Sequence, residues 1–306
     1  MYWNKKSNVE APETADIVAR LDWRNPAVIS NYRNRKITNN LIKLFSLVSV
    51  LLVLYPVFDI LYMFAYKGVL LLSIQTFTET TLAGGLSNAI LGTIIIIGLS
   101  AGIAIPLGVF GGIYMAEFSD RSKYASVVRF VSDVLAGLPS IVVGYFGFLA
   151  LVLYFNWGFS PMAAGITLSI LMLPYIIRTT ELSLRKVPST IREAAIALGS
   201  SKSQMVNRLT LRFAMPGILT GILISVGIAL SETAPLLYTA GFSNYQPCGL
   251  CFHSQTAYLT GIIYTFYTTP TAEFQNMAYL AAFLLILTVL LINVFARSLL
   301  RRFSKL

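Results

Sequence analysis

Long apolar blocks recur along the chain and are separated by shorter polar segments. Six blocks lie at residues 43–66, 88–116, 125–154, 161–183, 215–240 and 277–299, and each holds about 20 residues or more. A helix of about 20 apolar residues crosses the hydrocarbon core of a bilayer. The pattern therefore predicts an all-α, polytopic membrane protein with six transmembrane helices and a single membrane domain.

The composition supports this class. Hydrophobic residues make up 56% of the 306 residues and charged residues 12%, whereas soluble domains carry about 25% charged residues. The polar, charged start of the chain does not resemble a signal peptide, in which a short basic region precedes an apolar one. We expect an N-terminal arm over residues 1–42, the membrane domain over 43–299 and a tail over 300–306.

The distribution of Lys and Arg predicts the orientation. Eight cations lie from Lys5 to Lys43, three from Arg121 to Arg129, seven from Arg178 to Arg212, and four from Arg297 to Lys305. Lys67 alone lies in an outer segment, so 22 of the 23 cations share one side. Cytoplasmic loops carry such an excess, which predicts cytoplasmic termini in a plasma (inner) membrane. The net charge of +10 follows from this topology and does not indicate nucleic-acid binding, because the cations form no continuous basic face.

Glycine and proline recur inside the apolar blocks, for example at Gly92, Pro106, Gly112, Pro139 and Pro235. Small residues let helices pack closely in lipid, and proline leaves a carbonyl that neighbouring helices or water must satisfy. Both features suit a transporter whose helices move. Ordinary packing of membrane helices uses the same residues and explains them equally well.

The polar segment at residues 187–213 carries two helix-start signals. A capping box pairs a hydroxyl at the helix start with a Glu or Gln three residues later. Thr190 with Glu193 and Ser201 with Gln204 fit this spacing. The segment therefore predicts two consecutive short helices on the cytoplasmic side.

The first of these helices, expected over residues 191–198, would end at Gly199, a residue type that readily adopts the left-handed conformation. One face of it carries small and apolar side chains, namely those of Ile191, Ala194, Ala195 and Leu198. A shallow face of this kind suits insertion into a groove of a partner protein. The alternative is a helix lying on the membrane surface, which does not require two capped helices joined by a glycine.

At this segment the sequence resembles a known family. EAAIALG, from Glu193 to Gly199, followed by SSKSQMVNRLTL, resembles the cytoplasmic coupling loop of permease subunits of bacterial and archaeal ABC importers. Leu209 and Leu211 also match, whereas Arg212 stands where the pattern has proline. The resemblance implies the type I ABC importer permease (MetI-like) fold, with ATPase docking by Glu193, Ala194, Ala195, Leu198 and Gly199.

Four further segments narrow the resemblance to PstA-type permeases of phosphate importers: LSNAILGT, DVLAGLPSIVVG, LPYIIRTTE and ETAPLLYTA. It implies that inorganic phosphate is the substrate and that the partners are a second, PstC-like permease, a PstB-like ATPase dimer and an extracytoplasmic PstS-like phosphate-binding protein. The chain has no G-x-x-x-x-G-K-[ST] loop to cradle nucleotide phosphates. We therefore expect a subunit that is not an enzyme and holds no cofactor or metal, with ATP and Mg bound by the partner ATPase.

Charged residues at membrane depth are costly and are therefore candidates for function. Glu232, flanked by Ser231 and Thr233 in the fifth block, is the clearest candidate for the substrate pathway. A carboxylate does not bind anionic phosphate directly, so we interpret Glu232 as the counter-ion of an arginine on this chain or on the partner permease. The family pattern implies an arginine four residues earlier, where this chain has Ile228.

Other charged residues have weaker claims. Arg178 is a second pathway candidate, although an arginine that extends toward the interface beside Glu181 is the more ordinary interpretation. Asp133 is expected to cap the start of a helix, and Asp59 to face water near the outer end of the first span.

Cys248, Cys251 and His253 form a C-x-x-C-x-H cluster in the outer loop expected over residues 241–276. A structural metal site has four ligands as a rule, and no fourth lies nearby. A local disulfide is possible outside the cytoplasm. Chance proximity in a loop is the interpretation that we favour.

Two alternatives remain open at this stage. The chain could serve a transporter of another oxyanion, such as molybdate or sulfate, or a non-transporting membrane sensor that uses residues 187–213 to bind a cytoplasmic partner. A secondary transporter is disfavoured, because a docking loop would then have no purpose.

Overall fold

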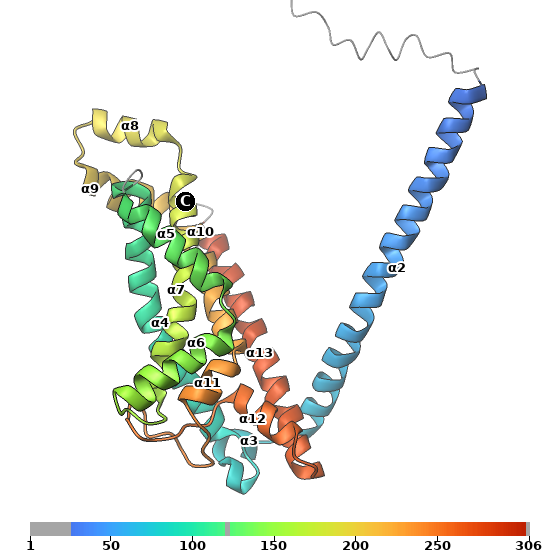
Figure 1. The fold of residues 1–306 in the computed structure, drawn as a ribbon, viewed down its shortest axis with the longest axis vertical. Helices are drawn as coiled ribbons and strands as arrows, with labels where there is room; N and C mark the ends of the chain where they lie inside the picture. The colour runs from blue at the N-terminus through green and yellow to red at the C-terminus, as the bar shows by residue number, and fades with distance from the viewer. Residues whose placement is uncertain (1–25, 120–122, 304–306) are drawn as a thin grey trace, which may run out of the picture. The chain divides into compact units, whose positions relative to one another are not determined.

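The chain folds into helices throughout the part that the structure, a computed structural model, describes: residues 26–119 and 123–303. Figure 1 shows their arrangement. The α-helices are α2 (Pro26–Leu71), α3 (Gln75–Thr78), α4 (Ser87–Ile113), α5 (Lys123–Gly137), α6 (Ser140–Gly147), α7 (Pro161–Arg185), α8 (Ser189–Ala197), α9 (Lys202–Met205), α10 (Leu211–Ser231), α11 (Ala234–Thr239), α12 (Leu259–Tyr267) and α13 (Ala272–Phe303). A 3-10 turn, η1, covers Thr81–Ala83, and three π-helical stretches extend neighbouring helices: η2 (Tyr114–Phe118), η3 (Phe148–Tyr154) and η4 (Val206–Thr210).

The first predicted span lies inside α2. The chain divides into two compact units, Met1–Met63 and Phe64–Leu306, and α2 begins in the first unit and ends in the second. Its apolar stretch, Arg35–Leu71, is long enough to cross a membrane. The helix already begins at Pro26, within the expected polar arm, and the first 25 residues lie outside the described part of the chain.

Five helices of the described chain are long and apolar enough to cross a membrane, and a bent helix pair makes a sixth candidate. The bent pair corresponds to the predicted block at residues 125–154, which is therefore not one straight span. Its two arms, α5 and α6 with η3, meet at an angle of 103°. Pro139 at the start of α6 has no N–H to continue the helix from α5, and its ψ of 132° is extended.

Small residues let the central helices α4, α7 and α10 approach closely. A Cβ atom added at Gly112 of α4 would overlap Thr180 of α7, and one added at Gly221 of α10 would overlap Thr179. The buried apolar core around Ile96, Leu168 and Ile176 fills the space among these helices. This packing is the one that the glycines of the apolar blocks predict in lipid.

The segments between α10 and α13 are more structured than the sequence predicted. The fifth apolar helix ends at Ser231 rather than at residue 240, and α11 is a separate short helix. The expected loop at 241–276 contains α12, whose side chains Leu259 and Ile262 are buried in a core shared with α13. The apolar residues of these segments pack against the bundle as short helices and do not extend a span.

Candidate docking element and substrate pathway

The helix α8 carries the sequence EAAIA. It follows α7 and lies beyond the C-terminal end of that helix, at one end of the bundle (Figure 1). It begins at Ser189, with Pro188 in the capping position and no side-chain cap. Thr190 therefore lies within the first turn, and the predicted capping box of Thr190 with Glu193 is wrong. The physical reason is that α8 starts two residues before the predicted residue 191, so Thr190 is its second helical residue and its hydroxyl is not at the capping position.

The second predicted capping box is confirmed. The Gln204 backbone N–H donates to Ser201 Oγ at 3.3 Å, and the Ser201 backbone N–H donates to Gln204 Oε1 at 3.0 Å. Between the two helices, Gly199 has φ +82°, the left-handed conformation expected of it. The N–H groups of Gly199 and Ser200 close the end of α8 on the carbonyls of Ile196 and Ala195.

The exposed side of α8 differs from the predicted docking face. Ala195 is only 3% exposed and packs against Met205 and Val206, because its small side chain lets α8 lie close to α9. Leu198 is 87% exposed. Glu193, Ala194 and Gly199 are exposed as well, so these residues and Leu198, without Ala195, form the accessible surface of the docking element.

The second predicted helix is not free-standing. From Lys202 the chain runs through α9, η4 and α10 to Ser231 as one helical segment of 30 residues. The sequence prediction of a short separate helix is wrong in this respect, because no glycine or proline lies between Lys202 and Leu211 to end it. The second part of the predicted docking segment is consequently the N-terminal end of the fifth span.

Two buried ionic contacts near α8 escaped the sequence interpretation. Arg192 of α8 donates through Nη2 to Glu117 Oε1 at 2.8 Å and to the carbonyl of Leu184 at 2.7 Å, and through Nη1 to the carbonyl of Val187 at 2.8 Å. Arg192 and Glu117 are 75 residues apart in the chain. No local pattern brings such a pair together.

The second contact centres on Glu181 of α7, whose side chain is 2% exposed. Arg129 of α5 lies 2.8 Å from it, Arg185 lies 3.0 Å from it, and Arg178 lies 3.7 Å from it. The pairing of Arg178 with Glu181 was visible in the sequence as an i, i+3 spacing, whereas that of Arg129 was not. The half-exposed Arg178 thus lies beside Glu181, as its more ordinary interpretation predicted.

Two further acidic residues, Asp133 and Asp59, are exposed on their helices. Asp133 lies exposed in the middle of α5, so its predicted role as a helix-start cap is wrong. The described part of that helix begins at Lys123, ten residues before Asp133. Asp59 is exposed on α2.

Glu232 lies at the end of α10 rather than within the span. Its ψ of 132° ends the helix, and its carbonyl accepts a hydrogen bond from Thr260 Oγ1 at 2.9 Å. The half-buried side chain lines an open pocket of about 420 Å³ with Leu223, Ile224, Gly227, Ile228, Ser231 and Asn293. No Lys or Arg lines this pocket, and no ion pair of Glu232 occurs among the described residues. If Glu232 has the predicted arginine partner, that arginine would therefore have to come from outside the described residues.

Thr233 belongs to a different pocket. This pocket, of about 490 Å³, is lined mainly by aromatic side chains, including those of Phe64, Tyr264, Tyr267 and Tyr279. Its polar lining groups are hydroxyls, and no Lys or Arg lines it, although Lys67 Nζ lies 4.0 Å from the centroid of the Tyr279 ring. The pocket at Glu232 is the more polar of the two and remains the candidate for the pathway.

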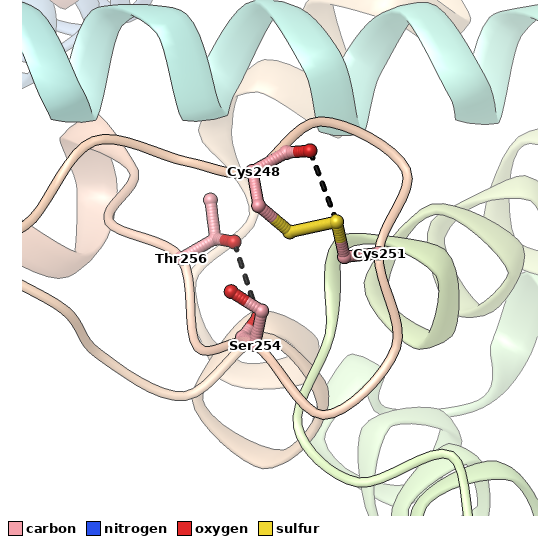
Figure 2. Close-up of a disulfide and its surroundings, with 4 residues drawn as sticks. All are labelled: Cys248, Cys251, Ser254 and Thr256. Carbon is pink, nitrogen blue, oxygen red and sulfur yellow. Dashed lines mark hydrogen bonds between the residues drawn. A yellow bond between two sulfur atoms is a disulfide. The ribbon is translucent and has the colours of Figure 1, made fainter.

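Cys248 and Cys251 form a disulfide, which Figure 2 shows in the outer loop. The favoured interpretation of chance proximity is therefore wrong, and the reason is that the loop turns back on itself at Gly249, with φ +83°. Within residues 26–119 and 123–303, no three His, Cys, Asp or Glu side chains group to hold a metal ion. The same loop turns again at Ser254, whose carbonyl accepts from Thr256 Oγ1 at 3.4 Å (Figure 2).

Hydrogen bonds fasten this loop to the outer end of α4. Thr81 Oγ1 lies 3.0 Å from Asn244 Oδ1, and Gln246 Nε2 donates to Ser87 Oγ at 2.7 Å. The loop backbone joins the segment before α7 through the N–H of His253, which donates to the carbonyl of Trp157 at 2.8 Å. The loop is thus a defined outer surface and not a loose connection.

The disulfide makes a direct test of sidedness possible, because the chain has no other cysteine. In intact cells, a membrane-impermeant maleimide should leave the chain unlabelled until an impermeant reductant is added, and then label it. Cys248→Ser should give labelling without reduction, as the control. Labelling only after permeabilisation would contradict both the outer position and the predicted topology.

The sequence and fold match known transport proteins. Residues 108–305 match the family model described as binding-protein-dependent transport system inner membrane component. The chain is 47% identical over 212 residues to phosphate transport system permease protein PstA 2 of Mycobacterium tuberculosis, covering 68% of this chain and 69% of that protein. It is 38% identical to phosphate transport system permease protein PstA of Yersinia pestis, covering 90% and 96%.

A solved structure shares the fold. A chain of the inward-facing MetNI methionine ABC transporter superposes with a TM-score of 0.55 at 20% identity, covering 76% of this chain and 99% of that one. Together with the family match, this confirms the predicted all-α, multi-span, MetI-like permease fold.

Proposed function

Because the chain belongs to the PstA family of phosphate transport system permeases, we propose that it is the membrane-spanning permease subunit of an ATP-driven phosphate importer. The observation that carries this proposal is the 38% identity to a phosphate permease over 90% of the chain. The exposed docking element on α8 supports it, because a permease without an ATPase domain needs such a contact.

The proposed complex has four kinds of component. A second, PstC-like permease would complete the translocation pathway, a PstB-like ATPase dimer would bind ATP and Mg on the cytoplasmic side, and a PstS-like protein would deliver phosphate from outside. This chain would hold no cofactor and catalyse no reaction. We infer from the cation count that both termini and α8 lie in the cytoplasm and the disulfide loop outside.

The continuity of α9, η4 and α10 suggests how force would cross the membrane. Movement of the ATPase would displace α8 and α9, and the helical segment would carry this movement along its 30 residues to Ser231. At about 1.5 Å per residue the far end lies about 45 Å away, where Glu232 lines the open pocket. The pathway would thus open or close at one end in response to ATP at the other.

Reconstituted vesicles would test the proposal. Complex containing this chain, the second permease, the ATPase and the binding protein should take up radiolabelled phosphate only when ATP is supplied on the ATPase side. Molybdate and sulfate, offered at the same concentration, should enter much more slowly. Preferred uptake of another oxyanion would show that phosphate is not the substrate. If the complex hydrolyses ATP but takes up no oxyanion, the chain would instead be part of a membrane sensor.

A further inference from the structure

One guanidinium joins three elements at the cytoplasmic end of the bundle. Arg192, on the second turn of α8, reaches the carbonyls of Leu184 and Val187 at the end of α7 and the carboxylate of Glu117 in η2, which continues α4. Arg192 is 23% exposed and Glu117 is 5% exposed. The contact is therefore an almost enclosed ion pair and not a surface one.

The chemistry of arginine suits these three acceptors. Its guanidinium is planar, always charged and able to donate several hydrogen bonds in fixed directions. The carbonyl of Leu184 also accepts the backbone N–H of Val187 at 3.1 Å, so Arg192 adds a further hydrogen bond there, and its charge meets the negative end of the α7 dipole. Removing one member of a buried ion pair leaves the other uncompensated, so α8 has one strongly preferred position relative to α4 and α7.

A second, apolar contact holds the same face of α8 one turn further along, since Arg192 and Ala195 are three residues apart. Ala195 packs against Met205 and Val206, at the start of the helical segment that becomes α10. The docking element is thus attached to α10 by packing and to α4 and α7 by Arg192. These are the three helices whose close packing forms the centre of the bundle.

We propose that Arg192, together with Glu117, is the positioning pair that makes α4 and α7 move with α8 when the ATPase moves it. The inference rests on the proposed function and assigns to these residues the coupling of ATP hydrolysis to transport. Arg192 does not form the docking surface, because its side chain faces the bundle. ATPase binding and transport should therefore be separable by substitution at this pair.

The test compares Arg192→Lys, Arg192→Gln and Glu117→Gln in the reconstituted complex. All three should retain ATPase that co-purifies with the membrane subunits, and ATP hydrolysis should remain within about twofold of wild type. Phosphate transported per ATP should fall about tenfold in Arg192→Gln, which corresponds to about 1.4 kcal/mol. Arg192→Lys keeps the charge but not the planar donor set, so a smaller loss of coupling is expected.

Arg208→Gln is the matched control, because Arg208 is an exposed cation on the same side with no ion pair among the residues described. It should transport as much phosphate per ATP as wild type. Unchanged coupling in Arg192→Lys, Arg192→Gln and Glu117→Gln would overturn the inference. So would a loss of transport that only follows a loss of bound ATPase.

A readout that is independent of the substrate separates this inference from the proposed function. A cysteine introduced at Ser231, which is exposed, should react with a maleimide at a rate that changes when ATP is added to the wild-type complex. In Arg192→Gln that change should shrink. If wild-type vesicles take up no phosphate but this change persists and depends on Arg192, the proposed substrate fails and the positioning role stands. A change unaffected by Arg192→Gln would overturn the role.

Discussion

Leu198→Asp should release the ATPase from the permease and abolish ATP-driven phosphate uptake, while the membrane domain stays folded. Leu198 is 87% exposed at the end of α8, so its side chain contributes little to the stability of this chain alone. A leucine of this size stabilises a contact by about 1.5–3 kcal/mol when a partner buries it. A carboxylate placed there adds a cost of desolvation, and we expect ATPase binding to weaken about 100-fold or more.

The measurement is the amount of ATPase that co-purifies with the membrane subunits in detergent. Leu250→Asp provides a matched control, because Leu250 is also an exposed leucine but lies in the outer loop with the disulfide. It should leave the amount of bound ATPase unchanged. Normal ATPase recovery with Leu198→Asp would show that another surface carries the docking.

The neighbouring glycine offers a milder and separate prediction. A Cβ atom added at Gly199 meets no heavy atom within 4 Å, but φ is +82°. Strain and not overlap therefore limits substitution: Gly199→Val should destabilise the turn by about 1–2 kcal/mol, and Gly199→Asn should be tolerated better because asparagine adopts this conformation more readily. Trypsin sensitivity of residues 187–213 in membranes would report the difference, and equal sensitivity would contradict it.

Local features of the molecule were predictable from the sequence because local properties determine them. The length of the apolar blocks gave five of the spans, and the spacing of Ser201 and Gln204 gave the start of α9. The conformation of Gly199 followed from the absence of a side chain. The bend at Pro139 was not predicted as a bend, although the residue that causes it was singled out, because the angle depends on how α6 packs against α11 and α7.

Contacts between distant residues were not predictable. Glu117 and Arg192 are 75 residues apart, and Arg129 and Glu181 are 52 apart. Patterns of neighbouring residues therefore do not indicate either pair. The burial of Ala195 was missed for a similar reason. Its face of α8 looked like a free apolar stripe, and only the return of the chain at Met205 and Val206 covers it. The exposure of Leu198 could be recognised only once Ala195 was known to be buried.

The end of α10 illustrates how the two kinds of information combine. The sequence singled out Glu232 as an expensive charge, and the structure places it at the helix end, beside a pocket without a cation. Ile228, where the family pattern implies an arginine, lines the same pocket. Residue 228 therefore carries no positive charge to compensate phosphate. The second permease is the component that would supply this charge.

Glu232→Gln should leave assembly intact and reduce phosphate uptake about 10- to 100-fold. The substitution keeps the size of the side chain and removes its charge. Truncating one member of a buried ion pair costs about 3–5 kcal/mol, and we expect a smaller effect here because Glu232 is only half buried. Assembly should survive, because docking depends on α8, about 45 Å away at the other end of the helical segment.

Uptake in vesicles is the measurement, and Glu273→Gln is its control, because Glu273 is an exposed carboxylate in the first turn of α13 that lines a different pocket. The control should transport like wild type. If Glu232 compensates an arginine of the second permease, neutralising that arginine and Glu232→Gln should each reduce uptake, and the double substitution should lose less than the sum of the two single losses. If Glu232→Gln transports like wild type, the carboxylate has no role beyond ending α10, and phosphate must pass through a pathway lined by other residues.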